Sequence, residues 1–292
     1  MTDPALSFGS VADSYDRGRP DYPREAVEWL VGTSPVSVLE LGAGTGKLTS
    51  TLVELGHDVF ATDPDDKMLD VLSARLPDVR ATVGTAEQIP APDGSFDVVV
   101  AAQAFHWFDQ EPALREISRV LKQGGRLALV WNSRDERIPW VRKLGALIGE
   151  RAGAGDEDPT MVIDDSALFS AVDSADFRHW QVVDRESIQD LVLSRSNLAV
   201  LPEEDRERKR AEVLAFYDDY GRGMDGMQLP YQTQCYRSVV LPRSLSTVQQ
   251  PETEPARAPL RPRVTSTDTA DRLPRVVTHE DDDTGMILID FR

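Results

Sequence analysis

Short apolar runs alternate with helix-like segments between residues 36 and 132, and this alternation constrains the fold of the chain more than any other feature. The apolar runs are VSVLEL, HDVFATD, VRATVG, SFDVVVAAQ and RLALVWN, and each has the length and β-branched content of a buried strand. The segments KLTSTLVEL, KMLDVLSARL and PALREISRVL instead repeat apolar residues at helical spacing. This pattern predicts an α/β, Rossmann-like fold with a doubly wound, mostly parallel sheet and helices on both faces.

The chain before this alternation predicts one helix. Pro23 suits the first position of a helix, where its missing N–H is not needed, and Gly32 suits a helix end. Apolar residues fall between them at helical spacing. We therefore divide this half of the chain into an N-terminal part, residues 1–35, and a core, residues 36–135.

The regular alternation ends after residue 135. Two further helices and two further strands are expected, over residues 140–151 and 203–220 and over residues 177–184 and 231–241 respectively.

We expect residues 136–241 to complete the sheet and to cover the substrate. Residues 242–292 are rich in Pro, Ser, Thr and charge. Such a segment cannot bury enough apolar area to offset its ordering entropy, so it predicts a disordered C-terminal tail.

The composition excludes several classes of protein. The formal net charge of −18 disfavours binding to nucleic acid or to an anionic membrane surface. There is no run of about 18 apolar residues, so no membrane span is expected. The N-terminus does not resemble a signal peptide, and the lone Cys235 cannot form an internal disulfide, which together favour a cytoplasmic location.

The four histidines predict no metal site. His57, His106, His179 and His279 are scattered, and none has metal-ligand spacing with Cys235.

The stretch LELGAGTGKLT, residues 39–49, resembles two phosphate-binding motifs and matches neither. A Walker A loop that ended at Gly46-Lys47 would need glycine at 41 and a hydroxyl at 48, but both positions are leucine. A dinucleotide fingerprint counted from Gly42 would need a third glycine where Lys47 stands. What remains is Glu40 followed by glycines at 42, 44 and 46, between a strand and a helix.

This loop suits a nucleoside ligand with a cationic portion. Glycines permit positive φ and a close approach of the ligand to the backbone. The loop is expected at the carboxyl end of the first strand, where open α/β sheets bind ligands. Glu40 would repel a pyrophosphate and attract a cation. Asp63 ends the second strand, 17 residues after Gly46, where an acid can accept from two ribose hydroxyls.

Four motifs in sequence order make the chain similar to a known family. VLELGAGTGKLT, ATDPDDKML, VGTAEQIPAPDGSFDVVVAAQAFHWF and ISRVLKQGGRLALVWN resemble the successive motifs of class I S-adenosylmethionine-dependent methyltransferases with a type 11 domain. The likeness covers roughly residues 36–132. YDRGRPDYP and the HWF step further resemble the small-molecule branch that includes trans-aconitate methyltransferase-like proteins.

The resemblance implies S-adenosyl-L-methionine as cofactor and gives each matching residue a role. Glu40 and the loop Gly42, Gly44 and Gly46 would hold the methionine part. Asp63 would bind both ribose hydroxyls, with Pro64 and Met68 lining the adenosine.

Further residues would surround the adenine and close the site. Ala86 and Glu87 follow the third strand, where the family binds the adenine edge. Gln103 would lie under the methionine moiety. The residues resembling an N-terminal helical lid are Tyr15, Arg19 and Tyr22, and Arg19 would meet the cofactor carboxylate.

One position departs from the family pattern. Many relatives carry an acid after the glycine that ends the third strand, and this chain has Thr85 there. The N6 acceptor would be the Thr85 hydroxyl, Glu87 or water.

The acceptor side depends on weaker signals. His106 follows the fourth strand and is a candidate general base, because its unperturbed pKa of about 6.5 suits proton transfer near neutrality. Packing beside Trp107 is the alternative for His106, and Trp107 would be a pocket wall. Arg134, Arg195 and Tyr231 could clamp a carboxylate, and solvated surface arginines are the alternative.

These observations predict methyl transfer to a small-molecule acceptor, such as a carboxylate or a lipid-like compound. One alternative is an NAD(P)-dependent oxidoreductase, against which Glu40 and Lys47 argue. A second alternative is a non-catalytic cofactor-binding scaffold protein. The tail after residue 242 could recruit a protein partner.

Overall fold

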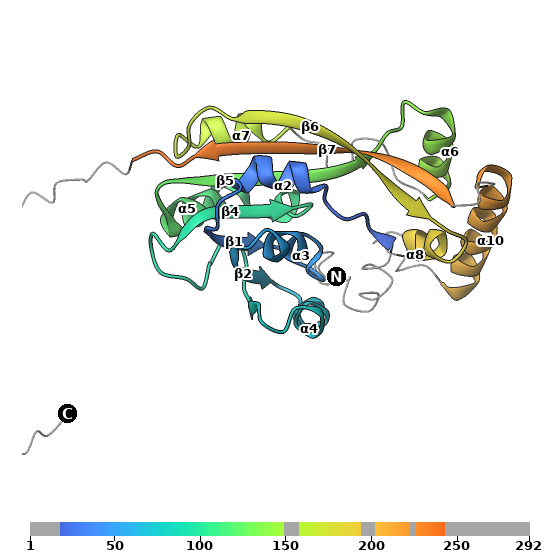
Figure 1. The fold of residues 1–292 in the computed structure, drawn as a ribbon, viewed down its shortest axis with the longest axis horizontal. Helices are drawn as coiled ribbons and strands as arrows, with labels where there is room; N and C mark the ends of the chain where they lie inside the picture. Colours follow the sequence, from blue (N-terminus) through green and yellow to red (C-terminus); the bar gives the residue numbers. More distant parts are fainter. Residues whose placement is uncertain (1–17, 149–157, 194–201, 222–225, 243–292) are drawn as a thin grey trace, which may run out of the picture. The chain divides into compact units, whose positions relative to one another are not determined.

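The computed structural model describes residues 18–148, 158–193, 202–221 and 226–242 (Figure 1). The predicted C-terminal tail therefore lies outside the described residues, except for its first residue. None of the helices in these ranges is both long and apolar enough to cross a membrane.

The strands of the described residues form a seven-stranded sheet in the order β3-β2-β1-β4-β5-β7-β6. Strands β1 to β5 are parallel to one another, whereas β7 is antiparallel to both β5 and β6. The strand bounds are β1 Ser37–Leu41, β2 Asp58–Asp63, β3 Arg80–Val83, β4 Phe96–Ala102, β5 Leu121–Arg134, β6 Asp173–Val183 and β7 Met227–Val239. The predicted mostly parallel α/β sheet is thus confirmed.

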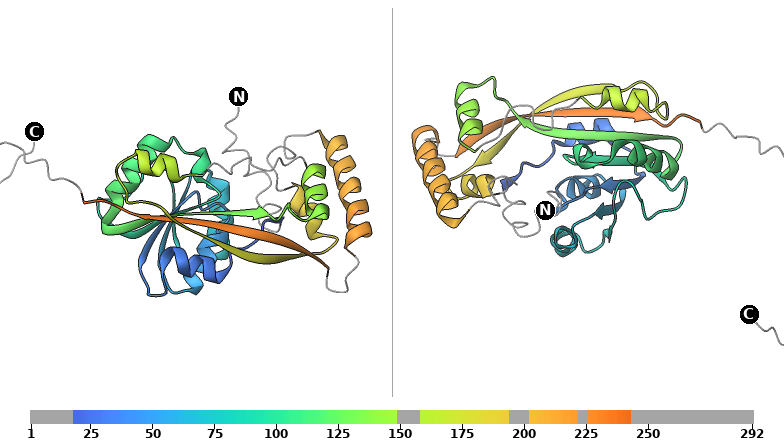
Figure 2. Two further views of the ribbon diagram at one scale, coloured as in Figure 1. Left: turned by 90° about the horizontal axis from the view of Figure 1, so that it is seen from above. Right: turned by 180° about the vertical axis from the view of Figure 1, so that it is seen from behind.

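Helices cover both faces of this sheet (Figure 2). The helix bounds are α2 Arg24–Val31, α3 Lys47–Glu54, α4 Asp66–Arg75, α5 Gln110–Val120, α6 Pro139–Leu147, α7 Thr160–Asp165, α8 Ser187–Leu193 and α10 Glu203–Tyr220, with a 3-10 turn η3 at Phe105–Trp107. Alternate strand residues point to opposite faces, so the sheet has two apolar layers. One layer packs on α2 and α3, and the other packs on α5.

The C-terminal strands are longer than the sequence indicated. Strand β6 begins at Asp173 instead of 177, and β7 begins at Met227 instead of 231. Strand β4 pairs with β5 only as far as Val130, so the end of β5 pairs with β7 alone. One face of these strands carries polar side chains. Polar residues therefore alternate with apolar ones in the sequence, and the continuous apolar run that indicates a buried strand is missing.

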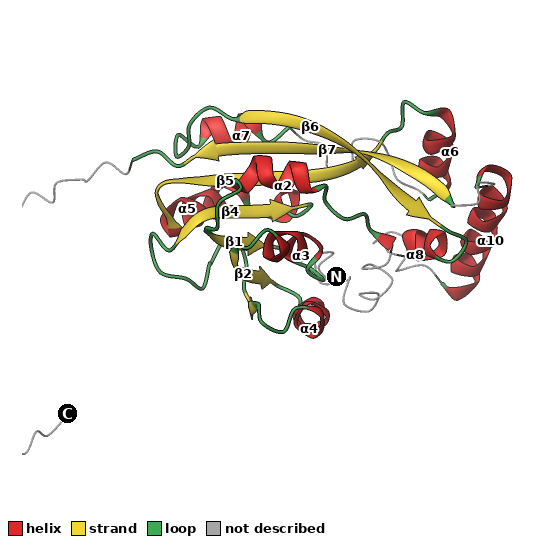
Figure 3. Ribbon diagram, in the orientation of Figure 1, coloured by secondary structure: helices red, strands yellow, loops and turns green. Residues whose placement is uncertain are grey.

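We call this projecting part the arm, and define it as residues 131–134 of β5, 227–234 of β7 and 176–183 of β6 (Figure 3). Helices α6, α8 and α10 gather at its far end around a third apolar cluster that includes Leu144, Leu191 and Phe216. Helices α7 and α8 were not predicted, because each is too short to show a helical period. The helix expected over residues 140–151 corresponds to α6, which ends at Leu147, and residues 149–151 lie outside the described residues.

Candidate functional site

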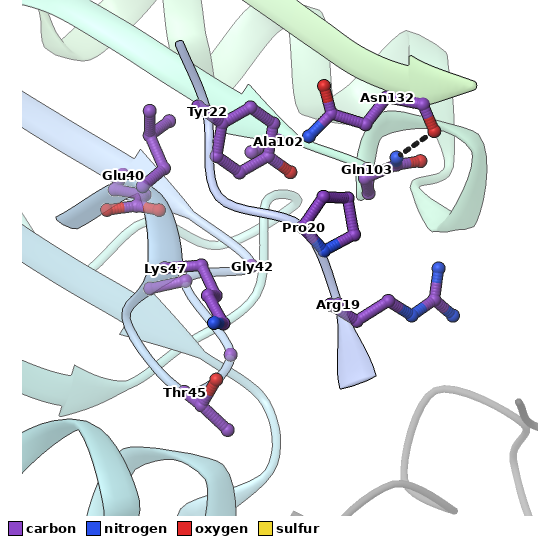
Figure 4. A pocket seen from close by; sticks show the side chains of 13 residues that line it. Arg19, Pro20, Tyr22, Glu40, Gly42, Thr45, Lys47, Ala102, Gln103 and Asn132 are labelled. Atoms are coloured by element: carbon purple, nitrogen blue, oxygen red, sulfur yellow. Dashed lines mark hydrogen bonds between the residues drawn. The ribbon is translucent and has the colours of Figure 1, made fainter. Parts of the chain in front are cut away.

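A cleft opens at the carboxyl edge of the parallel strands, and three separate segments line it (Figure 4). The first is the stretch before α2, the second is the glycine loop between β1 and α3, and the third is the ends of β4 and β5. The lining residues are Arg19, Pro20, Tyr22, Glu40, Gly42, Ala43, Gly44, Thr45, Lys47, Leu48, Ala102, Gln103 and Asn132. Open α/β sheets bind their ligands at this edge.

The glycine loop has a backbone that only glycine adopts easily. Gly42, Gly44 and Gly46 have φ of +69°, +56° and +85°. At Gly42 a Cβ would lie 2.5 Å from the Cβ of Ala104, so a side chain is excluded there by space as well as by φ. The loop therefore brings bare backbone to the cleft.

Asp63 fixes this loop to the end of β2. Its Oδ2 accepts a hydrogen bond from the N–H of Gly44 at 2.9 Å, and its Oδ1 accepts from the N–H of Asp65 at 2.9 Å. Burial raises the pKa of the Asp63 carboxyl, and the two backbone hydrogen bonds oppose that rise. Each carboxylate oxygen can accept a further hydrogen bond, so the group keeps acceptor capacity.

Glu40 is a buried acid in the floor of the cleft. Its side chain is 1% exposed, and its Oε2 accepts from the Thr49 hydroxyl at 2.7 Å. Burial raises the pKa of Glu40 to about 8; the Thr49 hydrogen bond opposes this rise and the charge of Asp63 adds to it. A cation placed beside this carboxyl would relieve the cost of its ionisation.

The residues before α2 form a wall that is held from two sides. The carboxylate of Asp21 pairs with the Lys47 ammonium at 3.0 Å, and the backbone carbonyl of Asp21 accepts from Nδ2 of Asn132 at 3.2 Å. Tyr22 is buried in the apolar layer beside α2 and α3. The Arg19 side chain points away from the glycine loop (Figure 4).

Gln103 lies at the opposite side of the cleft in a left-handed conformation. Its φ is +56°, which is uncommon for a residue with a side chain. Its Nε2 donates to the backbone carbonyl of Asn132 at 2.8 Å. This bond fixes the amide at the junction of β4 and β5, where its oxygen faces away from Asn132.

The predicted adenosine-side residues do not line the described cleft. Met68 and Ala86 are buried, and Glu87 accepts from the backbone N–H of Asp109 at 2.9 Å. Pro64 is half-buried in the turn after β2. Asp63 connects these residues to the cleft, because it contacts Gly44 on one side and accepts from Asp65 on the other.

The arm carries a row of three polar side chains beside the cleft, an arginine, a tyrosine and a histidine. Register pairs Arg134 of β5 with Tyr231 of β7, and Tyr231 with His179 of β6. Arg134 is 8% exposed, Tyr231 is 3% exposed, and the Tyr231 and His179 rings stack at 5.4 Å. Burial raises the pKa of Tyr231, against the opposing charges of Arg134 and Arg19. Burial also lowers the pKa of Arg134.

His106 and Trp107 lie outside the described cleft lining. Both belong to η3, their rings are 4.8 Å apart, and Trp107 is 46% exposed. Phe105 of the same turn is buried in the core. Tyr15 and Arg195 lie outside the described residues. The roles of these four site residues stay predictions.

Sequence reasoning missed Asn132, Thr233 and His179. Asn132 is the last residue of a predicted strand, at its carboxyl end, and that position was a signal for a cleft residue. For Thr233 and His179 the sequence held no such signal, because only strand register brings them close to the cleft. The described residues contain no group of three His, Cys, Asp or Glu side chains that could hold a metal ion.

The family model and the relatives that match this chain are described as methyltransferases. A family model described as a methyltransferase domain matches residues 39–129. An uncharacterized methyltransferase of Mycobacterium tuberculosis is 46% identical over 244 residues, which cover 82% of this chain and 97% of that protein. An uncharacterized methyltransferase of Schizosaccharomyces pombe is 36% identical over 245 residues, which cover 80% of this chain and 96% of that protein.

A solved structure shares the fold. A protein of Anabaena variabilis, named as a methyltransferase from an antibiotic biosynthesis pathway, has a TM-score of 0.55 and 21% identity. The superposition covers 75% of this chain and 98% of that chain. At this identity the likeness concerns the arrangement of the elements.

Proposed function

This chain belongs to the class I S-adenosylmethionine-dependent methyltransferases, and on that premise we propose where it binds the methyl donor and what kind of acceptor it methylates. The cleft at the carboxyl edge of β1, β4 and β5 is the proposed donor site. The observation that carries this proposal is the bond from the Gly44 N–H to Asp63, with the buried Glu40 beside the same loop.

The residues of the cleft fit this donor. S-adenosylmethionine has a sulfonium and an ammonium group, and a buried Glu40 favours a cation for the reason given above. The bare loop Gly42 to Gly46 permits close approach of the nucleoside, and Asp63 keeps acceptor capacity for ribose hydroxyls. We propose Gln103 and Arg19 at the methionine end.

The adenosine end is proposed from the family resemblance. Pro64 and Met68 would line the adenosine, and Ala86 and Glu87 would lie at the adenine edge. Thr85 is exposed, so its hydroxyl is available as an acceptor beside them.

The donor, when bound, supplies a methyl group already activated by its positive sulfur. The protein then has to hold the acceptor in line and to exclude water, and orientation of this kind can supply effective molarities of ~10⁵–10⁸ M. A carboxylate acceptor would need no general base, because it is already ionised. A hydroxyl or amine acceptor would need one, and His106 is the proposed candidate.

The proposed acceptor is a small organic acid. Arg134 and Tyr231 are buried side by side on the arm, and the charge of Arg19 acts on both. A guanidinium and a phenol donate hydrogen bonds that suit a carboxylate, and charge interactions are strong in a buried site. Tyr22, Trp107 and Arg195 are further proposed contacts. The small-molecule branch of the family, which includes trans-aconitate methyltransferase-like proteins, fits this chemistry.

The comparisons give no support to the oxidoreductase and scaffold alternatives, since the relatives described above are named methyltransferases. The lysine at the third glycine position of a dinucleotide fingerprint is consistent with this.

Calorimetric titration with S-adenosylhomocysteine tests the donor site. We expect saturable binding to the wild type. In Asp63→Asn we expect affinity to fall by about 10- to 100-fold, as for loss of a charge-assisted hydrogen bond. Asp70→Asn, on the exposed side of α4, is the matched control. A folded wild type that does not bind would refute the donor site.

A methylation screen tests the acceptor. It compares small organic acids, trans-aconitate included, with their neutral amides, and measures methyl transfer from labelled donor. We expect acids to be methylated and Arg134→Met to lose this activity, whereas Arg137→Met, at an exposed arginine nearby, retains it. Methylation of a protein or an RNA, with no small acid methylated, would overturn the proposal.

A further inference from the structure

We propose that His179, Thr233 and Asn132 form a hydrogen-bonded chain that positions the wall of the donor cleft, so that all three are positioning residues for donor binding. This inference rests on the proposed donor site. It gives a role to a buried hydroxyl and a half-buried imidazole that the proposed reaction does not use.

Strand register brings the three side chains onto one face of the arm. Thr233 of β7 pairs with Asn132 of β5 on one side and with Phe177 of β6 on the other. His179 follows Phe177 by two residues and so shares its face of the sheet. The Thr233 hydroxyl lies 2.6 Å from Oδ1 of Asn132 and 3.1 Å from Nδ1 of His179. Thr233 is 0% exposed, so water does not compete for these bonds.

The donor and the acceptor of each hydrogen bond in this series follow from the bond between Asn132 and Asp21. The backbone carbonyl of Asp21 can only accept, so Asn132 must turn its Nδ2 toward it, at 3.2 Å. Oδ1 of Asn132 then faces Thr233, and the Thr233 hydroxyl must donate to it. Because a hydroxyl has one hydrogen, the remaining bond must be donated by Nδ1 of His179.

This direction fixes the tautomer of His179. Burial lowers the pKa of the ring, against the opposing charge and carbonyl of Asp21, and so favours the neutral form. The neutral ring that can donate from Nδ1 has its only proton there. The ring is also held by its stacking on Tyr231 at 5.4 Å.

The series of hydrogen bonds from His179 through Thr233 ends at the cleft, at Asn132. Asn132 lines the cleft, holds the carbonyl of Asp21 through its side chain and accepts from Gln103 through its own carbonyl. The second tie on Asp21 is its ion pair with Lys47, in which the Asp21 side chain is 76% exposed. The Lys47 side chain is 17% exposed, so this pair is open to solvent mainly at its Asp21 end. The bond from Asn132 is a separate tie, on the Asp21 backbone, and it is the one that the Thr233 hydroxyl orients.

The test compares Thr233→Val with Thr233→Ser. Valine keeps the shape and removes the hydroxyl, whereas serine keeps the hydroxyl. Calorimetry with S-adenosylhomocysteine should show an increase of about tenfold in Kd for Thr233→Val, equal to about 1.4 kcal/mol, and an increase of less than about threefold for Thr233→Ser. Circular dichroism would confirm that each variant is folded.

A second pair of variants tests the other end of the chain if Thr233→Val does not fold. His179→Asn keeps an N–H close to the position of Nδ1, and His179→Leu removes it. The leucine variant should bind S-adenosylhomocysteine about tenfold more weakly than the asparagine variant. NMR of the imidazole carbons should independently show the neutral ring with its proton on Nδ1.

The outcomes separate this inference from the proposed donor site. If the wild type does not bind S-adenosylhomocysteine, both fail. If the wild type binds and the folded Thr233→Val variant binds equally well, the hydroxyl has only a structural role and the inference alone is overturned. A proton on Nε2 of His179 would also overturn it, because the chain would then run in the wrong direction.

Discussion

Replacement of Glu40 by glutamine should change how the stability of the ligand-free protein depends on pH. Glutamine has the shape of glutamate, and its carbonyl oxygen can accept the same hydrogen bond from Thr49. It does not titrate. The substitution therefore removes one ionisable group from the cleft and leaves its packing and its hydrogen bond in place.

The sign and the size follow from the pKa of Glu40, which burial raises from the ordinary 4.5 to about 8. Between these values the folded chain keeps a proton that the unfolded chain has lost, so stability falls as pH rises. Below pH 4.5 both states are protonated, and above about 8 both are ionised. At 1.36 kcal/mol for each pH unit, the free energy of unfolding falls by up to roughly 5 kcal/mol across this window.

Urea unfolding of the wild type and of Glu40→Gln at pH 5, 6, 7 and 8 measures this difference directly. The wild type should lose stability relative to the variant at each step. Glu54→Gln, on the exposed side of α3, is the matched control and should follow the wild type. Parallel stability curves for the wild type and Glu40→Gln would refute the claim that the folded chain protects a neutral acid.

Three further predictions concern other parts of the protein. Gly42→Ala should lower the melting temperature more than Gly44→Ala, because both force a side chain into positive φ but only Gly42 also meets a neighbour at 2.5 Å. Burial raises the pKa of the Cys235 thiol to about 12, and the charge of Asp176 adds to this rise. The thiol should therefore react with iodoacetamide only after unfolding, which mass spectrometry would show. Although burial opposes them, hydrogen bonds from Lys122 and Ser37 hold the pKa of Asp97 at about 2. Lys122→Met should therefore lower the stability at neutral pH, and in acid unfolding its difference from the wild type should shrink as pH falls through about 2.

The central strands were predictable because they are buried on both faces. A parallel strand between two layers of helices has few polar positions, so β1, β2 and β4 contain adjacent apolar residues, which are VL, VFA and VVVAA respectively. The strands of the arm have one polar face, and their apolar residues alternate with Thr233, His179 and similar side chains. Strand β6 accordingly began four residues earlier than expected, at Asp173.

The positions of the candidate donor-binding residues could be predicted for a related reason. Glu40 and the three glycines lie within seven consecutive positions, and the strand and helix on either side fix where that loop must lie. Asp63 is one loop and one strand further on. No long-range pairing had to be known to place any of these residues at one edge of the sheet.

The side-chain contacts of the arm could not be predicted in this way, because they depend on the register between strands that are distant in the sequence. The bond between Thr233 and Asn132 spans 101 residues, and the bond between Thr233 and His179 spans 54. A shift of one residue in the pairing of β7 would turn Thr233 to the other face, away from Asn132 and His179. Since β7 runs antiparallel between β5 and β6, it also carries Tyr231 back to the row of Arg134. The sequence thus specifies the glycine loop through local backbone geometry, whereas the face beside it is specified only by the completed sheet. Substitutions on that face can therefore alter its polar side chains without altering the glycine loop.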